Sequence, residues 1–192
     1  MKPQIETDDY TIYLTGIESG PESLTRHERE QMAAADLIHT AFGPEAKKSH
    51  YPDGAPFITG YTDIPVSLSH STSSCLLAVG KNSQVIGADI ESPRPQLRRV
   101  CSRFLNSAEQ LRLTEEDNTA SAAMNFLLKC WTAKEAVYKA ARTPGLGLTE
   151  ISISQDFTQA NARGQRYDLA FHDAPATEEI ICVAIAAGQF IS

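Results

Sequence analysis

Hydrophobic and polar positions follow two different periods along this chain. Alternation with a period of two predicts strands near residues 10–17, 66–70, 76–79 and 85–91. Helical periodicity predicts helices near residues 26–42, 95–105, 107–115 and 120–142. Apolar runs predict three closing strands near residues 149–154, 167–172 and 180–187. The order of these elements favours the α+β class with antiparallel sheets.

Short signals mark where two of the helices begin and end. Thr25 and Glu28 have the spacing of a capping box, in which each side chain pairs with a free backbone amide of the other residue. Gly43 predicts the end of the same helix. Ser107 and Gln110 have the spacing of a second capping box. The first helix is therefore expected to span about residues 26–42.

The polar segment 81–84 lies between two predicted strands and is expected to form a four-residue hairpin loop. No internal repeat, low-complexity tract or long linker divides the chain. We therefore expect two lobes that pack as one unit.

Composition narrows the class of protein. With 192 residues, 42% hydrophobic and 21% charged, the chain has the profile of a globular protein. The net charge of −7 argues against a protein that binds nucleic acid mainly by neutralising phosphates. The longest aliphatic run, residues 180–187, is too short to cross a membrane, and the N-terminus lacks the apolar stretch of a secretory signal.

Four widely spaced cysteines lie among apolar neighbours and form no CxxC pair. They are Cys75, Cys101, Cys130 and Cys182. We interpret them as buried, reduced thiols, which favours the cytoplasm.

The first candidate for chemistry is the pair Asp89 and Glu91. Residues two apart on a strand project from the same face, so these carboxylates repel each other unless a cation lies between them. A solvated polar face at the end of a strand is the alternative interpretation.

The second candidate lies on the long predicted helix. Lys134 falls within its apolar stripe, either because its amine reaches solvent past the core or because it has a specific anionic partner. Glu135 and Lys139 lie one turn apart and could form an ordinary surface ion pair. Together with Asp89 and Glu91, however, these groups could hold Mg²⁺ and the oxygens of a polyanion.

His70 lies between two serines, Ser69 and Ser71, which could suggest a serine nucleophile beside a base. Adjacent strand residues point to opposite faces, and the chain has no G-x-S-x-G motif, so we disfavour a serine hydrolase. A phosphate contact or a structural hydrogen bond fits His70 better.

Three segments in this order resemble the signatures of 4′-phosphopantetheinyl transferases. The segments are Val66-Ser67-Leu68-Ser69-His70-Ser71, Gly87-Ala88-Asp89-Ile90-Glu91 and Trp131-Thr132-Ala133-Lys134-Glu135-Ala136-Val137-Tyr138-Lys139. With the turn at Gly54, the resemblance covers about residues 24–150. The chain length is similar to that of the two-lobed monomeric branch, which implies two similar α+β lobes packed as a pseudo-dimer with the active site between them. We place the lobes at residues 1–84 and 85–192.

The resemblance implies a set of site residues. Asp89, Glu91 and Glu135 match the ligands of Mg²⁺ or Mn²⁺. Glu135 also matches a base for the incoming serine, and Lys139 matches a catalytic lysine near the scissile phosphate. The residues that would bind coenzyme A are Ser69 and His70 at the 3′-phosphate, Gly54 and Pro56 at the adenine, and Lys134 and Lys139.

The resemblance also implies the reaction and its partners. The serine of an apo acyl or peptidyl carrier protein would attack the β-phosphate of coenzyme A, take the 4′-phosphopantetheine arm and release adenosine 3′,5′-bisphosphate. An arginine cluster that follows Glu91 suggests a surface for an acidic carrier, although a solvated helix face is the alternative. The cluster consists of Arg94, Arg98, Arg99 and Arg103.

Two further features concern the contacts to coenzyme A. The turn reads Gly54-Ala55-Pro56, where the family commonly has Gly-Lys-Pro, so one cation near coenzyme A is missing. Basic residues of the first lobe that could hold the 3′-phosphate are Arg26, Arg29, Lys47 and Lys48.

Two other classes of protein remain open. A Mg²⁺-dependent hydrolase of a pyrophosphate-containing nucleotide would need the same carboxylates. A non-catalytic protein that binds coenzyme A or a carrier would retain them as structure.

Overall fold

The computed structural model describes residues 2–17, 24–82, 84–116, 119–175 and 177–190. It shows an α+β protein in which every paired strand of the described residues is antiparallel, so the predicted fold class is confirmed. None of the helices within these residues is long and apolar enough to cross a membrane.

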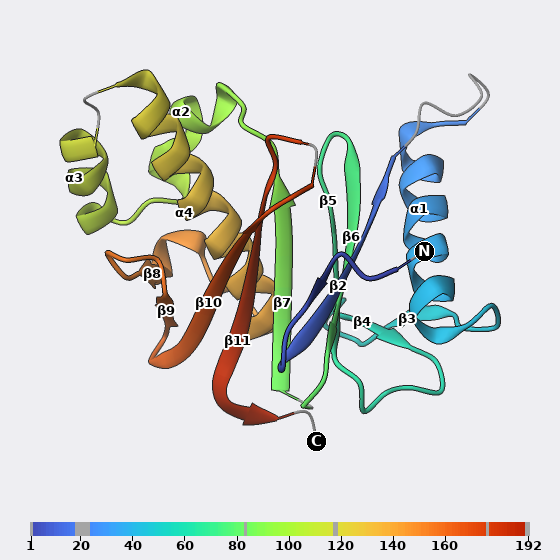
Figure 1. The fold of residues 1–192 in the computed structure, drawn as a ribbon. Helices are drawn as coiled ribbons and strands as arrows, with labels where there is room; N and C mark the ends of the chain where they lie inside the picture. The colour runs from blue at the N-terminus through green and yellow to red at the C-terminus, as the bar shows by residue number, and fades with distance from the viewer. Residues whose placement is uncertain (1, 18–23, 83, 117–118, 176, 191–192) are drawn as a thin grey trace.

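The first sheet is built from the N-terminal half of the chain and has the strand order β1-β2-β6-β5. Its strands are β1 (Ile5–Glu6), β2 (Tyr10–Gly16), β5 (Val66–His70) and β6 (Ser74–Gly80). Helix α1 (Arg26–Phe42) packs on β2 and β6, at the right of Figure 1. A small hairpin of β3 (Lys48–His50) and β4 (Pro56–Ile58) follows α1.

The second sheet has the order β7-β11-β10-β9-β8. Its strands are β7 (Gln84–Glu91), β8 (Ile151–Ile153), β9 (Gln159–Ala162), β10 (Gln165–Asp173) and β11 (Ile180–Phe190). Helix α4 (Ala120–Ala141) packs on this sheet, mainly on β7 and β11 (Figure 1). The remaining helices are α2 (Gln96–Val100), α3 (Ser107–Glu116) and the 3₁₀ turns η1 (Cys101–Arg103) and η2 (Leu148–Glu150).

Capping boxes form at the starts of α1 and α3, and the second box differs from its predicted position. The Thr25 side chain accepts a hydrogen bond from the Glu28 amide, and Glu28 accepts one from the Thr25 amide, so the first predicted box is confirmed. The second box is formed one residue earlier than predicted. Asn106 caps α3, its amide donates to Glu109, and the Glu109 amide donates back to the Asn106 side chain. The predicted helix 95–105 is also wrong as a single helix, because α2 gives way to η1 at Cys101.

The predicted hairpin between β6 and β7 is wrong. In the described part of the loop, the chain leaves the first sheet after Gly80 and begins the second at Gln84, where β7 pairs with β11. Ser83 lies outside the described residues. Strand β7 nevertheless lies against β5 and β6, so the two sheets meet there (Figure 1). Strand β9 escaped prediction because its segment, Gln159–Ala162, carries little hydrophobic signal.

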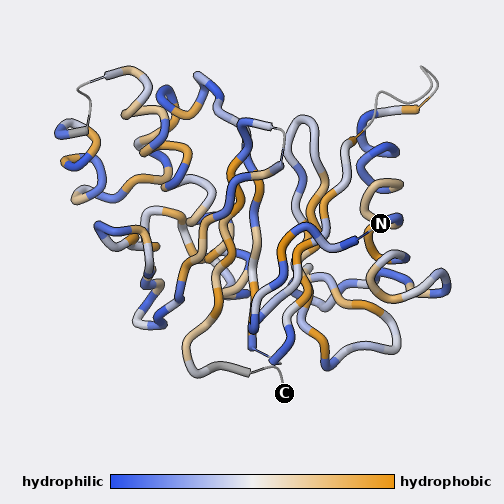
Figure 2. Tube along the Cα trace, viewed as in Figure 1, coloured by the Kyte–Doolittle hydropathy of each residue, from blue (hydrophilic) through white to orange (hydrophobic). Residues whose placement is uncertain are grey.

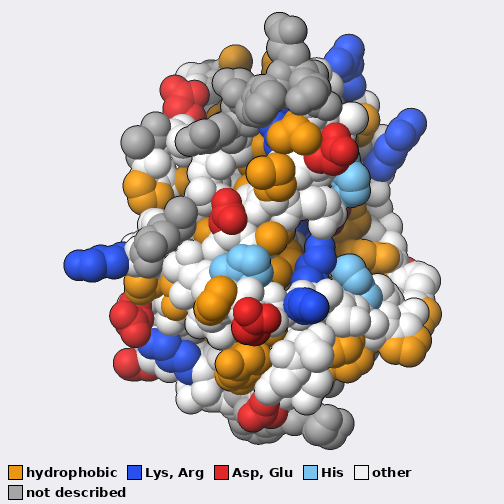
Figure 3. Space-filling view, turned by 90° about the vertical axis from the view of Figure 1, so that its right-hand side faces the viewer, with side chains coloured by type: hydrophobic (Ala, Val, Ile, Leu, Met, Phe, Trp, Pro, Cys, Tyr) orange, Lys and Arg blue, Asp and Glu red, His pale blue; other side chains and the backbone are white. Residues whose placement is uncertain are grey.

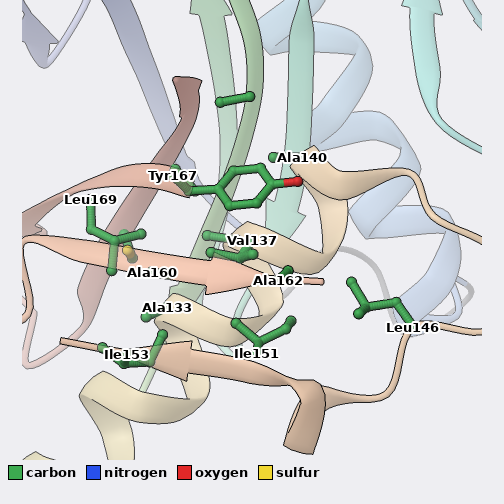
Figure 4. Close-up of a cluster of buried hydrophobic side chains, with 14 residues drawn as sticks. Ala133, Val137, Ala140, Leu146, Ile151, Ile153, Ala160, Ala162, Tyr167 and Leu169 are labelled. Carbon is green, nitrogen blue, oxygen red and sulfur yellow. The ribbon is translucent and has the colours of Figure 1, made fainter. Parts of the chain in front are cut away.

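The hydrophobic segments gather along the central strands, whereas α1 and α3 at the two sides are largely hydrophilic (Figure 2). The largest buried cluster lies between α4 and the second sheet, where Val137 and Ala133 face Leu169 and Ala160 (Figure 4). Helix α4 approaches β7 so closely that a Cβ on Gly87 would overlap the Ala136 carbonyl oxygen. The glycine of the Gly87–Glu91 segment is therefore required by packing.

Basic, acidic and apolar side chains are interspersed on the face that carries α1 (Figure 3). All four cysteines are free thiols, and three of them, Cys75, Cys130 and Cys182, are buried.

Candidate active site

Asp89 lies where β5, β7 and α4 meet. Its Oδ1 accepts a hydrogen bond of 2.6 Å from Ser69 Oγ on β5 and lies 2.8 Å from Lys139 Nζ on α4. Lys139 also donates to the Ala88 carbonyl at 3.1 Å. The Asp89 side chain is buried, and its Oδ2 has no hydrogen-bond partner among the described residues. Half of this carboxylate is thus held in place while the other half is unpartnered.

Ser67 and Ser69 both point from β5 toward β7. The Ala88 amide donates to Ser67 Oγ at 2.8 Å, two residues from the contact between Ser69 and Asp89. The two serines on this face of β5 therefore bind the first sheet to β7, the strand that carries Asp89 and Glu91.

Glu91 is fixed by the side chains of two neighbours. Its Oε1 accepts hydrogen bonds of 2.6 Å from Trp131 Nε1 and 2.9 Å from Arg94 Nη2, and the Arg94 guanidinium lies 5.4 Å from the centre of the Trp131 ring. Burial, then the charge of Asp89, raises the pKa of Glu91 to about 7, although Trp131 and Arg94 act in the opposite direction. The charge of Glu135 raises this pKa further.

Glu135 lies on α4, one turn before Lys139. It is half-buried and makes no hydrogen bond or ion pair with another described residue. Burial and the charge of Asp89 raise the pKa of its carboxyl. The surface ion pair between Glu135 and Lys139 that we considered from the sequence is not formed, because the Lys139 ammonium is bound to Asp89.

The chemistry of these three carboxylates fits a divalent cation. After burial, the charge of Asp89 raises the pKa of both Glu91 and Glu135, and Asp89 keeps one buried oxygen unpartnered among the described residues. Hard oxygen donors with unrelieved negative charge are what Mg²⁺ prefers. As the side chains stand, no three His, Cys, Asp or Glu groups of the described residues converge on one point. Holding a metal with all three carboxylates would therefore require side-chain movements.

A cavity of about 520 Å³ reaches Lys139, the residue that binds Asp89. Three of the predicted site residues, Gly54, Pro56 and Lys139, line it. Further lining residues include Lys48, His50, Tyr51, Asp53, Tyr138 and Arg142. Among the described residues that line the cavity, Asp53 is the one carboxylate, and Arg142 lies against it at 2.7 Å. Basic side chains therefore outnumber acidic ones in this lining, in a chain whose net charge is −7.

The structure separates Ser69 from His70. Ser69 is buried against Asp89, whereas the His70 side chain is 54% exposed on the other face of β5, with Nε2 3.6 Å from Glu30 Oε2. Neither Ser69 nor His70 is among the described residues that line the cavity. Adjacent strand positions explain this separation.

Lys134 does not reach the cavity. Its side chain is 0% exposed, and its ammonium lies 2.6 Å from Glu109 Oε2, 3.0 Å from the Leu148 carbonyl and 2.6 Å from the Ile151 carbonyl. These three acceptors use its three N–H donors. These contacts give no support to the expectation that Lys134 binds coenzyme A. The anionic partner that its sequence position suggested is Glu109.

Only one of the four basic residues considered for the 3′-phosphate lines the cavity among the described residues. That residue is Lys48. Arg26 is bound to Glu30 and to the Ser71 carbonyl, and Arg29 donates to the Leu24 carbonyl.

Sequence reasoning missed Glu179, a buried residue immediately before β11. Its carboxylate accepts hydrogen bonds from Ser71, from Ser73 at 2.8 Å, from Ser74 at 2.6 Å and from Ser92 at 3.0 Å. Burial raises the pKa of Glu179, but these four hydroxyls together outweigh burial and lower it. The cluster fastens the loop after His70 to the end of β7. The run of serines was the only signal for it in the sequence.

The comparison with family models agrees with the motifs. A family model described as the 4′-phosphopantetheinyl transferase superfamily matches residues 85–185, more than half of the chain. Among solved structures, the chain is similar to a holo-[acyl-carrier-protein] synthase (AcpS) from Thermotoga maritima, with 12% identity and a TM-score of 0.40. That match covers 54% of this chain and 63% of the synthase, less than two thirds of its length. No curated protein sequence matches.

Proposed function

The chain belongs to the 4′-phosphopantetheinyl transferase superfamily, and from this premise we propose that it transfers the 4′-phosphopantetheine arm of coenzyme A to a serine of an apo acyl or peptidyl carrier protein. Adenosine 3′,5′-bisphosphate is the second product. In this proposal the enzyme is of the holo-[acyl-carrier-protein] synthase type.

The position of Lys139 carries the proposal. Its ammonium lies 2.8 Å from Asp89, and the same residue lines the cavity. It therefore joins a carboxylate cluster suited to a divalent cation with a basic cavity suited to a polyanion. Coenzyme A offers such a polyanion, with a pyrophosphate that can lie at Lys139 while its nucleotide occupies the cavity.

In the proposed reaction the serine Oγ forms a bond to the β-phosphorus, and the bond from that phosphorus to the bridging oxygen breaks. The serine proton passes to Glu135, the half-buried carboxylate one turn before Lys139 on α4. The Lys139 ammonium stabilises the charge that develops on the phosphate oxygens. The bisphosphate leaves with the electron pair of the broken bond.

Asp89, Glu91 and Glu135 are the residues that would hold Mg²⁺ or Mn²⁺. The bound ion would supply a Lewis acid that spreads the negative charge of the two phosphates. Ser69 would position Asp89 for this task through the hydrogen bond of 2.6 Å. The contacts of Trp131 and Arg94 would hold Glu91 on the same side.

We assign the nucleotide end of coenzyme A to the cavity. Gly54 and Pro56 line it at the turn after β3, where we place the adenine. Lys48 lines the same cavity and is our candidate for the 3′-phosphate. His70 remains a candidate only if the phosphate reaches the exposed face of β5.

The two-lobed monomeric branch is the form that we propose. Two antiparallel sheets, each with its own long helix, support a division near Gln84, with lobes at residues 1–84 and 85–192. The carboxylates and the cavity lie where these two parts meet, as Asp89 and Ser69 illustrate. The free cysteines support a reducing compartment, the cytoplasm.

A carrier protein would dock beside the end of β7. Arg99 and Arg103 are exposed there, whereas Arg94 is occupied by Glu91. Acidic helices of a carrier would be attracted to such a surface.

Intact-mass spectrometry tests the proposal directly. An apo acyl carrier protein is incubated with this protein, coenzyme A and Mg²⁺, with EDTA and Glu135→Gln as controls. We expect a mass gain of one phosphopantetheine arm that is abolished by EDTA and strongly reduced in Glu135→Gln. Release of adenosine bisphosphate without any carrier would instead indicate a hydrolase. Binding of coenzyme A without any turnover across several carriers would indicate a binding protein.

A further inference from the structure

Arg142 fastens the end of α4 to the turn between β3 and β4. Its Nε lies 2.7 Å from Asp53 Oδ2, and its Nη2 lies 3.0 Å from Asp53 Oδ1. The guanidinium carbon also lies 4.4 Å from the centre of the Tyr51 ring. A bidentate pair combined with an aromatic contact fixes the plane of the guanidinium. All three residues line the cavity.

The same pair organises the backbone of the turn. Asp53 Oδ1, which receives Nη2 of Arg142, also accepts the Ala55 amide at 3.1 Å. The Tyr51 amide donates to the Ala55 carbonyl at 2.9 Å, and the Gly54 amide donates to the Tyr51 carbonyl at 2.9 Å. Asp53 is therefore both the partner of Arg142 and the cap of the turn.

The backbone of Arg142 is unusual. The residue ends α4 with φ 48° and ψ 29°, the left-handed region that a residue with a Cβ seldom adopts. Glycine is the common residue at such a helix end. Here an arginine takes the position, and its side chain makes the contacts with Asp53 and Tyr51.

We propose, resting on the function proposed above, that Arg142 is a positioning residue for the nucleotide end of coenzyme A. It holds the Tyr51–Pro56 turn against α4 and so fixes the wall of the cavity.

The chain offers a matched control in Arg163. Its Nε lies 2.7 Å from Glu150 Oε2 and its Nη2 3.0 Å from Glu150 Oε1, the same bidentate geometry. Its φ of 49° is also left-handed. Among the described residues that line the cavity, Arg163 and Glu150 are absent. Loss of this pair should therefore leave the cavity unchanged.

Amide hydrogen exchange measures the stability of the hydrogen bonds in the turn and does not depend on any activity. Arg142→Ala should accelerate exchange at Ala55 and Gly54, whereas Arg163→Ala should leave both amides unchanged. Equal exchange in wild type and Arg142→Ala would overturn the positioning role.

Calorimetric titration then measures the effect of the same substitution on the Kd for coenzyme A. Arg142→Ala should raise the Kd by about threefold to fivefold, the upper part of the range that an exposed ion pair supplies. The KM for the carrier should stay the same, and Arg163→Ala should bind as the wild type does. An unchanged Kd in Arg142→Ala would refute the proposal.

Arg142→Lys separates positioning from direct contact, because lysine keeps the cation but not the bidentate pair with Asp53. Faster exchange at Ala55 together with weaker coenzyme A binding supports positioning. Wild-type affinity despite faster exchange would mean that the cation contacts the ligand itself, which overturns it. Absence of coenzyme A binding in the wild type would defeat the proposed function instead, while the exchange data would still show whether Arg142 holds the turn.

Discussion

Replacing Lys134 by methionine tests the buried ion pair that joins α3 to α4. The Lys134 and Glu109 side chains are 0% and 2% exposed, and their charged atoms lie 2.6 Å apart. Methionine fills most of the volume of lysine but supplies neither the charge nor the donors. Glu109 would keep its hydrogen bonds from the amides of Asn106 and Ile153, yet its charge would lack a counterion.

The expected loss is large because the remaining partner is buried. Removing one member of a buried ion pair costs about 3–5 kcal/mol, since the other charge stays desolvated. For a protein of this size each kcal/mol lowers Tm by roughly 2–4 °C, so Lys134→Met should melt roughly 6–20 °C lower. Arg163→Ala removes an exposed pair, with side chains 46% and 42% exposed, and should cost at most about 1 kcal/mol.

Urea unfolding of a double-mutant cycle measures the pair. Glu109→Gln in the Lys134→Met background should recover much of the lost unfolding free energy, because the uncompensated charge is removed. Below its melting temperature, Lys134→Met should bind coenzyme A within about twofold of the wild type. A loss below about 1 kcal/mol, or a large loss of coenzyme A affinity in folded protein, would refute a purely structural role for Lys134.

Three further results are expected. Gly87→Ala should lower the unfolding free energy by at least about 2 kcal/mol in urea titrations, because the added Cβ forces α4 away from β7; a neutral result would contradict the close packing. Burial and the charge of Asp89 raise the pKa of Glu91 from its ordinary value of 4.5 to about 7 in the folded protein. The contribution of Glu91 to folding stability is therefore fully present below about pH 4.5 and is lost as the pH rises through 7. Glu91→Gln should therefore remove up to about 3 kcal/mol of that decline, measured as unfolding free energy against pH, and an unaltered slope would speak against it. Arg99→Glu should raise the KM for an acidic carrier severalfold and leave the KM for coenzyme A alone, whereas an unchanged carrier KM would exclude this docking surface.

Local sequence was sufficient for most of the elements. The capping box of Thr25 and Glu28 depends on groups three residues apart, so it could be read from the chain and is present in the structure. Alternation in Val66–His70 likewise gave the strand and the opposite directions of Ser69 and His70. The capping box at Asn106 was misplaced by one residue because asparagine and serine both cap well, and only the hydrogen bonds decide between them.

The sequence signatures also indicated which carboxylates belong together. The hydrogen-bond and ion-pair partners of these carboxylates, however, depend on the tertiary structure. The sequence indicated that Asp89, Glu91, Glu135 and Lys139 belong together. It paired Lys139 with Glu135 as one interpretation, since one helical turn separates them. In the tertiary structure Lys139 instead pairs with Asp89, because α4 packs directly on β7 at Gly87.

Contacts between distant segments depended on the tertiary structure alone. The hairpin predicted after Gly80 was wrong because strand pairing is decided by which sheet completes its core, and β7 pairs with β11 about ninety residues later. Lys134 forms an ion pair with Glu109 on another helix, and Glu179 accepts hydrogen bonds from serines in two separate loops. The sequence by itself determined elements and chemical types, whose causes are local hydrogen bonds and periodicity. Only the packing of remote segments decided which charge faces which, because burial and distance set the energy of each pair.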